Sequence, residues 1–143
     1  MRHLQRRSPA ETCARLLGVL LLAAGVAGFF YNGTFTSNEH IHDDMLGIFR
    51  VNGWSNTLNV LLGIWGLAAV AAPGTRAYGY GAGLVLVALG VWGFVLGTGQ
   101  SILSIVPVNA ADNWARLLLG IAALLAAAFS SARQRTTTAR AAA

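Results

Sequence analysis

Four apolar stretches alternate with polar segments along the chain. They cover roughly residues 14–31, 56–72, 78–98 and 114–131. Each is near the length of about 20 residues that an α-helix needs to cross the hydrocarbon core of a bilayer. The pattern predicts an all-α integral membrane four-helix bundle over residues 14–131. Residues 1–13 form an N-terminal segment, and residues 132–143 form a tail without an apolar face, which we expect to be disordered.

The polar and apolar pattern occurs twice. Two pairs of segments correspond without a gap: residues 46–64 with 103–121, and residues 25–29 with 90–94. In the longer pair, Asn52 matches Asn109 and Gly63 matches Gly120. The chain therefore predicts two tandem helical hairpins of the same topology, a parallel internal repeat whose pseudo-two-fold axis follows the membrane normal.

Composition and charge support a membrane location. Hydrophobic residues make up 55% of the 143 residues and charged residues 10%, which is too few to cover a soluble domain of this size. The ten basic residues are all arginine, as is typical of a GC-rich bacterial genome. The net charge of +5 does not indicate nucleic-acid binding, because the arginines follow a topology pattern. The lone Cys13 excludes an internal disulfide.

The distribution of charge predicts the orientation. Most arginines lie before the first stretch, between the second and third, and after the fourth, whereas four of the five acidic residues lie in the other two connections. The positive-inside rule then places both termini in the cytoplasm, in a bacterial inner membrane. The first stretch could be a cleaved signal peptide, but three further spans follow, and we expect it to remain as a helix.

A glycine face marks the third stretch. Its members share one side of a helix: Gly79, Gly83, Gly90, Gly93 and Gly97. Small residues let helix backbones approach closely in a membrane, so we expect a packing seam on this side of the helix. A ligand groove is the less favoured interpretation.

Two polar faces lead into the second and fourth stretches. One carries Asn52, Asn56 and Asn59, and the other carries Asn109, Asp112, Asn113 and Arg116. Such side chains are costly in contact with lipid, so we expect both faces to meet inside the bundle or to line a hydrated vestibule. Helix capping with interhelical hydrogen bonding is the favoured role, because Asn109 and Asp112 have capping-box spacing. A binding site is the alternative.

Arg116 is the strongest single candidate for a functional residue. It lies about one turn into the fourth stretch, four residues after Asp112, which is the spacing of a helical ion pair. We expect Asp112 and the carboxylates of the outer loop to hold its guanidinium near the outer surface, where an anionic headgroup or an acidic partner could also reach it. Snorkelling to the interface is the other interpretation.

The outer loop offers weak candidates for metal ligands. His40, His42, Asp43 and Asp44 are close in sequence, but their spacing does not specify a metal, and we expect no metal or other cofactor. No phosphate-binding loop, nucleophile elbow or zinc-protease helix is present in the sequence.

The two repeat segments carry a resemblance to a family. Residues 47–67 and 106–120 resemble the bacterial four-helix membrane proteins catalogued as domain of unknown function 4383. The resemblance covers roughly residues 14–128 and implies fold and membrane location, without an activity. It also implies a histidine in each repeat, at the positions that Asn59 and Arg116 occupy here, so no haem, metal or proton-relay role of those histidines carries over.

These features predict a non-enzymatic accessory or scaffold protein. We expect contacts with the lipid bilayer and with other membrane proteins or a second copy of the chain, and none with nucleic acid. The alternative is a small transporter or channel with a path between the polar faces around Asn59 and Arg116. A membrane enzyme ranks third.

Overall fold

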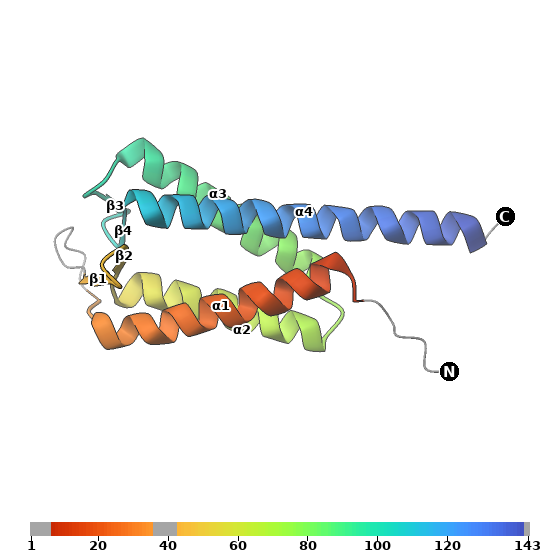
Figure 1. The fold of residues 1–143 in the computed structure, drawn as a ribbon, viewed down its shortest axis with the longest axis horizontal. Coiled ribbons are helices and arrows are strands. Elements are labelled where there is room, and N and C mark those ends of the chain that lie inside the picture. The colour runs from red at the N-terminus through yellow and green to blue at the C-terminus, as the bar shows by residue number, and fades with distance from the viewer. Residues whose placement is uncertain (1–6, 36–42, 142–143) are drawn as a thin grey trace.

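Two antiparallel helical hairpins form the structure. The computed structural model describes residues 7–35 and 43–141, with side chains as far as residue 130. The described part contains four helices: α1 (Pro9–Tyr31), α2 (Gly53–Ala71), α3 (Thr75–Leu96) and α4 (Ala110–Ala141). The first hairpin pairs α1 with α2, the second pairs α3 with α4, and α1 packs against both helices of the second hairpin (Figure 1). The predicted all-α four-helix bundle is confirmed.

Polar caps make the helices begin before their apolar stretches. Ser8 Oγ accepts a hydrogen bond from the backbone N–H of Glu11 at 3.1 Å, and proline follows at the first helical position, so α1 begins at Pro9 rather than near residue 14. Asn52 and Ser55 form a reciprocal capping box that begins α2. Hydropathy alone does not detect these polar first turns.

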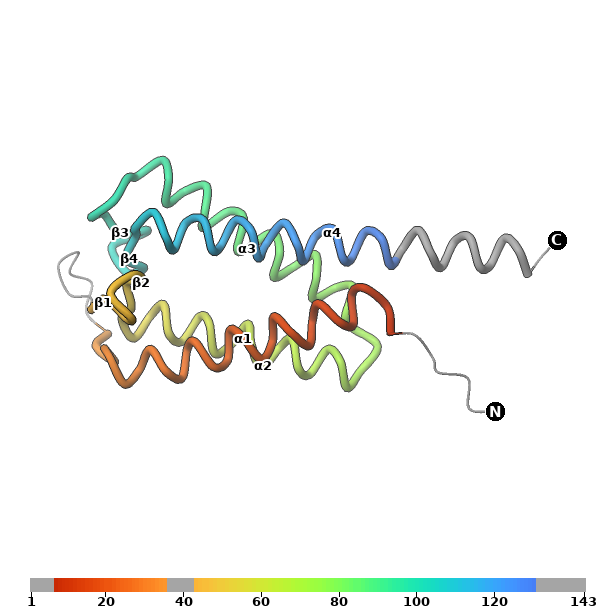
Figure 2. The backbone as a smooth tube through the Cα atoms, in the orientation of Figure 1, coloured from red at the N-terminus to blue at the C-terminus, as the bar shows by residue number. Residues whose placement is uncertain are grey.

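The fourth helix is longer than predicted. Its backbone continues to Ala141, through a segment in which we expected disorder from residue 132. Alanine, glutamine and arginine in this segment have high helix propensity, which favours a continuous helix. The backbone trace in Figure 2 shows that α1 begins at the end of the bundle toward which α4 extends.

A short two-stranded sheet lies at the other end of each helical hairpin. The first sheet joins β1 (Asp43–Met45) to β2 (Phe49–Val51), and the second joins β3 (Ser101–Ile102) to β4 (Val106–Pro107). Both pairs are antiparallel, and both lie at the end away from the start of α1 (Figure 1). Strands this short leave no alternating pattern in a sequence, so the sequence predicts no strand in either segment.

The two sheets turn in the same unusual way. Positive φ angles occur at Leu46 (56°) and Gly47 (71°) in the first sheet, and at the matching Leu103 (53°) and Ser104 (60°) in the second. Residues with a Cβ rarely adopt this left-handed conformation. At the second of these matched positions the first sheet has Gly47, and the second sheet has Ser104.

Exchanging these two residues should therefore change stability in opposite directions. We expect Ser104→Gly to raise the free energy of unfolding by about 0.5–1 kcal/mol, because glycine adopts positive φ without the Cβ clash. The reverse change, Gly47→Ser, should lower it by a similar amount. Unfolding in detergent micelles measures both, and equal stabilities of the two variants would contradict the argument.

Glycines hold the helices of each hairpin in close contact. In the second hairpin, a Cβ built on Gly90 would lie 3.0 Å from Asn113 O, and one on Gly83 would lie 2.9 Å from Gly120 O. In the first, a Cβ on Gly25 would lie 2.7 Å from Asn56 O. Backbone meets backbone at these positions, so any side chain would separate the helices.

The expected glycine face needs one correction. Gly79, Gly83, Gly90 and Gly93 all lie against α4, but Gly97 does not. It follows the last residue of α3 with a φ of 89°, and a Cβ there would meet nothing within 4 Å. Glycine adopts this positive φ without a Cβ clash at the point where the chain leaves α3, and Gly97 has no part in the packing seam.

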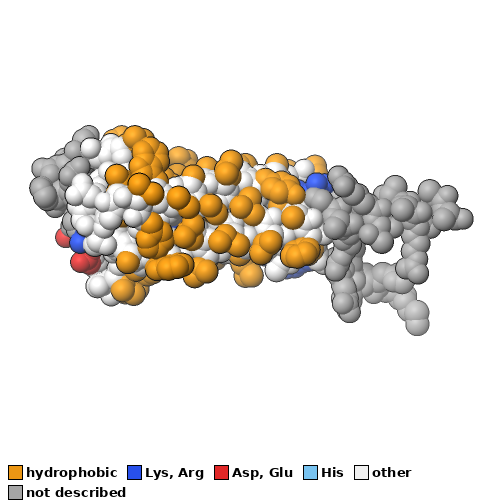
Figure 3. Space-filling view, turned by 90° about the horizontal axis from the view of Figure 1, so that it is seen from above, with side chains coloured by type: hydrophobic (Ala, Val, Ile, Leu, Met, Phe, Trp, Pro, Cys, Tyr) orange, Lys and Arg blue, Asp and Glu red, His pale blue; other side chains and the backbone are white. Residues whose placement is uncertain are grey.

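The outer surface and the core are both suited to a bilayer. Four helices are long and apolar enough to cross a membrane, with α4 contributing residues Ala110–Ser130. Hydrophobic side chains cover the length of the bundle in Figure 3, and the arginines and carboxylates lie toward its ends. The core of small and apolar side chains includes Ala14, Tyr78, Ala82, Leu86 and Ala123. These features describe a multi-pass membrane protein.

Candidate functional site

Asn52 and Asn109 begin α2 and α4 at matching positions of the two hairpins. Asn52 Oδ1 accepts from the backbone N–H of Ser55 at 2.9 Å, and Asn109 Oδ1 accepts from that of Asp112 at 2.7 Å. Each oxygen satisfies one of the free N–H groups of a helix start. The capping role expected for Asn109 is therefore seen in the structure.

The amide nitrogens of the same two residues join the halves of the protein. Asn52 Nδ2 donates to Ile105 O at 2.7 Å, and Asn109 Nδ2 donates to Ile48 O at 2.6 Å. Ile48 and Ile105 are themselves matching positions, so the two bonds are reciprocal. Each helical hairpin holds the sheet of the other. We call these two hydrogen bonds, together with the contacts of Arg50 described next, the junction.

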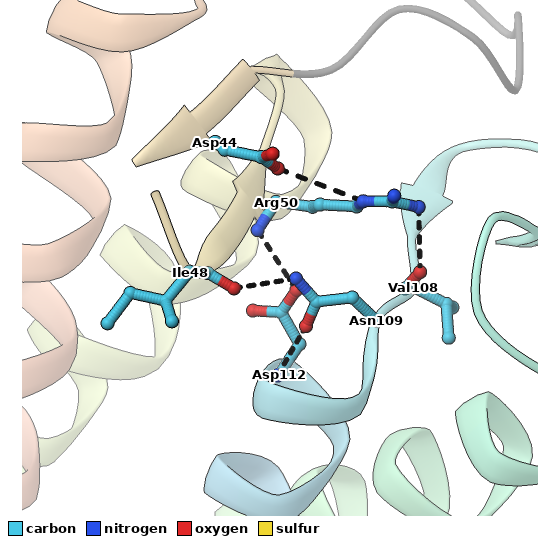
Figure 4. A network of polar contacts seen from close by, with 6 residues as sticks. All are labelled: Asp44, Ile48, Arg50, Val108, Asn109 and Asp112. Atoms are coloured by element: carbon cyan, nitrogen blue, oxygen red, sulfur yellow. Dashed lines mark hydrogen bonds and ion pairs between the residues drawn. The ribbon is translucent and has the colours of Figure 1, made fainter. Parts of the chain in front are cut away.

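Arg50 reaches from β2 to the second helical hairpin (Figure 4). Its backbone N–H donates to Asp112 Oδ2 at 3.1 Å, and its Nη1 donates to Val108 O at 3.3 Å. Its Nε lies 3.8 Å from Asp44 Oδ1. Only 21% of the Arg50 side chain is exposed, which strengthens these contacts relative to a surface ion pair.

The contacts of Arg50 have no counterpart in the other half. The position that matches Arg50 is Pro107, which has no backbone N–H to donate. The position that matches Asp112 is Ser55, which caps α2 instead. The junction thus combines a reciprocal part made by Asn52 and Asn109 with a one-sided part made by Arg50.

Asn56 and Asn113 lie deeper and face the neighbouring helix of their own hairpin. Asn56 Nδ2 donates to Asn32 O at 2.8 Å. The side-chain oxygens of both residues are buried without a hydrogen-bond partner in the described part of the chain. A Cβ on Gly28 would collide with the Asn56 amide, and one on Gly93 with the Asn113 amide. These two asparagines therefore act in helix packing within each hairpin.

The ion pair expected between Asp112 and Arg116 is not formed. No described carboxylate lies within 4.0 Å of the Arg116 guanidinium. Asp112 instead accepts from the Arg50 N–H, and Asp44 pairs with Arg50. The i, i+4 spacing predicted the wrong partner because an arginine distant in sequence, Arg50, engages both carboxylates.

Arg116 keeps an open donor inside the bundle. The residue is half-buried, and its Nη1 is buried without a hydrogen-bond partner among the described residues. Asn59, the matching residue of α2, is also half-buried, and its side chain forms no hydrogen bond with another described residue. On the polar faces, Asn52 and Asn109 therefore make hydrogen bonds that join the two halves. Asn59 and Arg116 make none with their side chains to another described residue.

The metal-ligand candidates are only partly described. Asp43 lies in β1, and Asp44 pairs with Arg50, whereas His40 and His42 lie outside the described residues. Within residues 7–35 and 43–141, no three His, Cys, Asp or Glu side chains gather as metal ligands would.

Arg50 is the residue of the junction that sequence analysis missed. In the sequence it is the single basic residue of an acidic connection. Its partners Val108 and Asp112 are 58 and 62 residues away in the chain, and no local spacing connects them. Its isolated positive charge opposite several carboxylates was the one available signal.

Comparison with known proteins supplies a family. No curated protein and no solved structure matches the chain. The family model described as "Domain of unknown function (DUF4383)" matches residues 11–129, a span that includes α2 and α3, nearly all of the apolar parts of α1 and α4, and the whole junction. The predicted resemblance is confirmed, and the chain belongs to this family.

Proposed function

We propose that this protein is a non-enzymatic accessory or scaffold subunit of the bacterial inner membrane, built from a duplicated helical hairpin. Both termini lie in the cytoplasm, and the protein acts through contacts of its outer surface with other membrane proteins, with a second copy of itself or with lipid. The orientation rests on the distribution of arginine.

The junction is the observation that carries this proposal. The polar groups that the sequence concentrates at the outer end bind one another: Asn52 with Ile105, Asn109 with Ile48, and Arg50 with Asp112. A substrate site needs polar groups that converge on open space. Groups already paired across two halves of a protein instead fix its shape, which suits a subunit that presents a rigid surface.

A small transporter or channel is the second candidate, and the open donor of Arg116 favours it. A path from Arg116 to the other side would pass the core beside Ala123. That core is tightly closed, because Tyr78, Ala82 and Ala123 are 0% exposed and Leu86 is 2% exposed. The closed core supports the accessory function over a continuous hydrated path.

Two measurements on Arg116→Gln test the choice. The wild-type protein, extracted gently from native membranes, should migrate as an assembly larger than one chain. Arg116→Gln should keep its helix content but retain less of the co-purifying partner, because the half-buried guanidinium has no ion-pair partner in the described part of the chain and can pair with an acidic group of the partner. Proteoliposomes containing either protein should be no more permeable to ions and small solutes than empty vesicles. A protein that runs as a single chain and raises permeability in an Arg116-dependent way would replace this proposal with the transporter.

A further inference from the structure

A groove of about 630 Å³ runs between α1 and α4, along the exposed side of the bundle. Leu17, which is 4% exposed, lies at its base, and the more exposed Leu16 (66%) and Leu20 (50%) lie along it on α1. On the α4 side, Leu119 and Ala122 complete the lining. The long apolar part of the groove is open to the surroundings of the bundle, at the depth of the membrane.

One end of the groove is polar and basic. Arg7, Pro9, Thr12 and Cys13 line it where α1 begins. The groove therefore changes from polar to apolar as it runs from the end of the bundle toward the membrane centre. A hydrogen bond of 2.9 Å from Ala10 N–H to Ser130 Oγ joins α1 to α4 near this end.

The polar end carries an excess of positive charge. Arg7 Nε lies 3.7 Å from Glu11 Oε1, and Arg15 Nη2 lies 3.3 Å from the same oxygen. Two guanidinium groups thus share one carboxylate, which leaves one positive charge unbalanced. The Arg7 side chain is 58% exposed and can turn toward a ligand at the mouth of the groove.

We infer that this groove binds one anionic phospholipid of the leaflet on the side where α1 begins. An acyl chain lies along Leu16, Leu17 and Leu20, and the phosphate lies beside Arg7. This order of charged, polar and apolar lining follows the order of headgroup, glycerol and acyl chain along a phospholipid. The inference rests on the membrane location within the proposed function and adds the chemistry of one lipid partner.

The charge and the position of the groove favour a lipid over a protein segment. A membrane-exposed groove is filled by acyl chains unless a protein displaces them, and the unbalanced arginine selects an anionic headgroup. A helix of a partner protein would need small residues facing its backbone. The groove presents leucines instead.

Native mass spectrometry of the full chain from nanodiscs of mixed phosphatidylglycerol and phosphatidylcholine tests the inference. The wild-type protein should retain one phosphatidylglycerol in preference to phosphatidylcholine. Arg7→Gln should reduce this preference about fivefold, the effect of one arginine near an anionic headgroup. Arg76→Gln, which removes an equal charge at the start of α3, should leave the preference unchanged.

Filling the groove provides the second variant. Ala122→Phe should lower retention of the bound lipid about tenfold or more, because the ring occupies the place of the acyl chain. Ala128→Phe is the matched control, since Ala128 is also exposed on α4 but does not line the groove. Both alanines are exposed, so neither change disturbs the core, and thermal unfolding checks this.

Three results would overturn the inference: equal retention of the two lipids by the wild-type protein, unchanged retention in Ala122→Phe, or equal losses in Ala122→Phe and Ala128→Phe. None of them bears on the assembly size or the permeability that test the proposed function. A lipid site and an accessory role can therefore fail separately.

Discussion

Gly63→Ala should lower the free energy of unfolding by about 1–3 kcal/mol, the cost of overpacking a closely packed contact. A Cβ at this position would lie 2.5 Å from Leu22 N and 2.7 Å from Leu22 Cα. Both are backbone atoms of α1, which cannot move aside as a flexible side chain does. The two helices of the first hairpin would have to separate, and each would lose dispersion contacts along the seam. Unfolding in detergent micelles, followed by circular dichroism, measures the effect.

Two further variants define the cause. Gly120→Ala should reproduce the loss in the second hairpin, because a Cβ there would lie 2.8 Å from Gly83 O. Gly74→Ala should be nearly neutral, since the nearest atom to its Cβ would be 3.8 Å away. If Gly63→Ala and Gly74→Ala have the same free energy of unfolding, close backbone approach at the glycines does not hold the hairpins together.

Substitutions of Asn52 should separate its two roles. Serine caps a helix as well as asparagine but has no amide to donate, so Asn52→Ser loses only the bond to Ile105 O. We expect this to cost about 1 kcal/mol, because the partly buried carbonyl of Ile105 loses its hydrogen-bond donor. Asn52→Ala removes the cap as well and should cost about 1 kcal/mol more.

A neighbouring asparagine gives the control. Asn59→Ser makes the same chemical change about two turns further along α2, where the side chain forms no hydrogen bond with a described residue. It should change the free energy of unfolding by less than about 0.5 kcal/mol. If Asn52→Ser and Asn59→Ser had the same free energy of unfolding, the hydrogen bond from Asn52 to Ile105 O would not stabilise the fold.

Hydropathy and residue spacing were sufficient to predict the architecture. The four spans, the hairpin pairing and four of the five glycines of the seam follow from periodicity, because long regular helices repeat their pattern many times. The structure begins α1 at Pro9 and α2 at Gly53, earlier than the apolar stretches that start near residues 14 and 56. Capping residues are polar, so they lie outside an apolar stretch. Gly97 was misassigned because helical spacing continues past the real end of α3 at Leu96.

The polar site was harder to predict because its contacts are not local. Asn109 and Asp112 were correctly paired as a cap, which depends only on neighbouring residues. The reciprocal bonds of Asn52 and Asn109 depend on how the two halves meet. Arg116 was given Asp112 as its partner on helical spacing, and only the folded chain brings Arg50 to that carboxylate.

The one-sided contacts of Arg50 have a consequence for assembly. A pair of identical hairpins related by a true two-fold axis would make every bond of the junction twice, as the asparagines do. Such a homodimer could not contain both Arg50 and Pro107 at one position, or both Asp112 and Ser55 at another. Covalent linkage of two hairpins removes that constraint, because each half can then specialise. The Arg50 contacts also distinguish the first hairpin from the second. If the chain is cut between α2 and α3, the two fragments should therefore associate as first half with second half, rather than each half with a copy of itself.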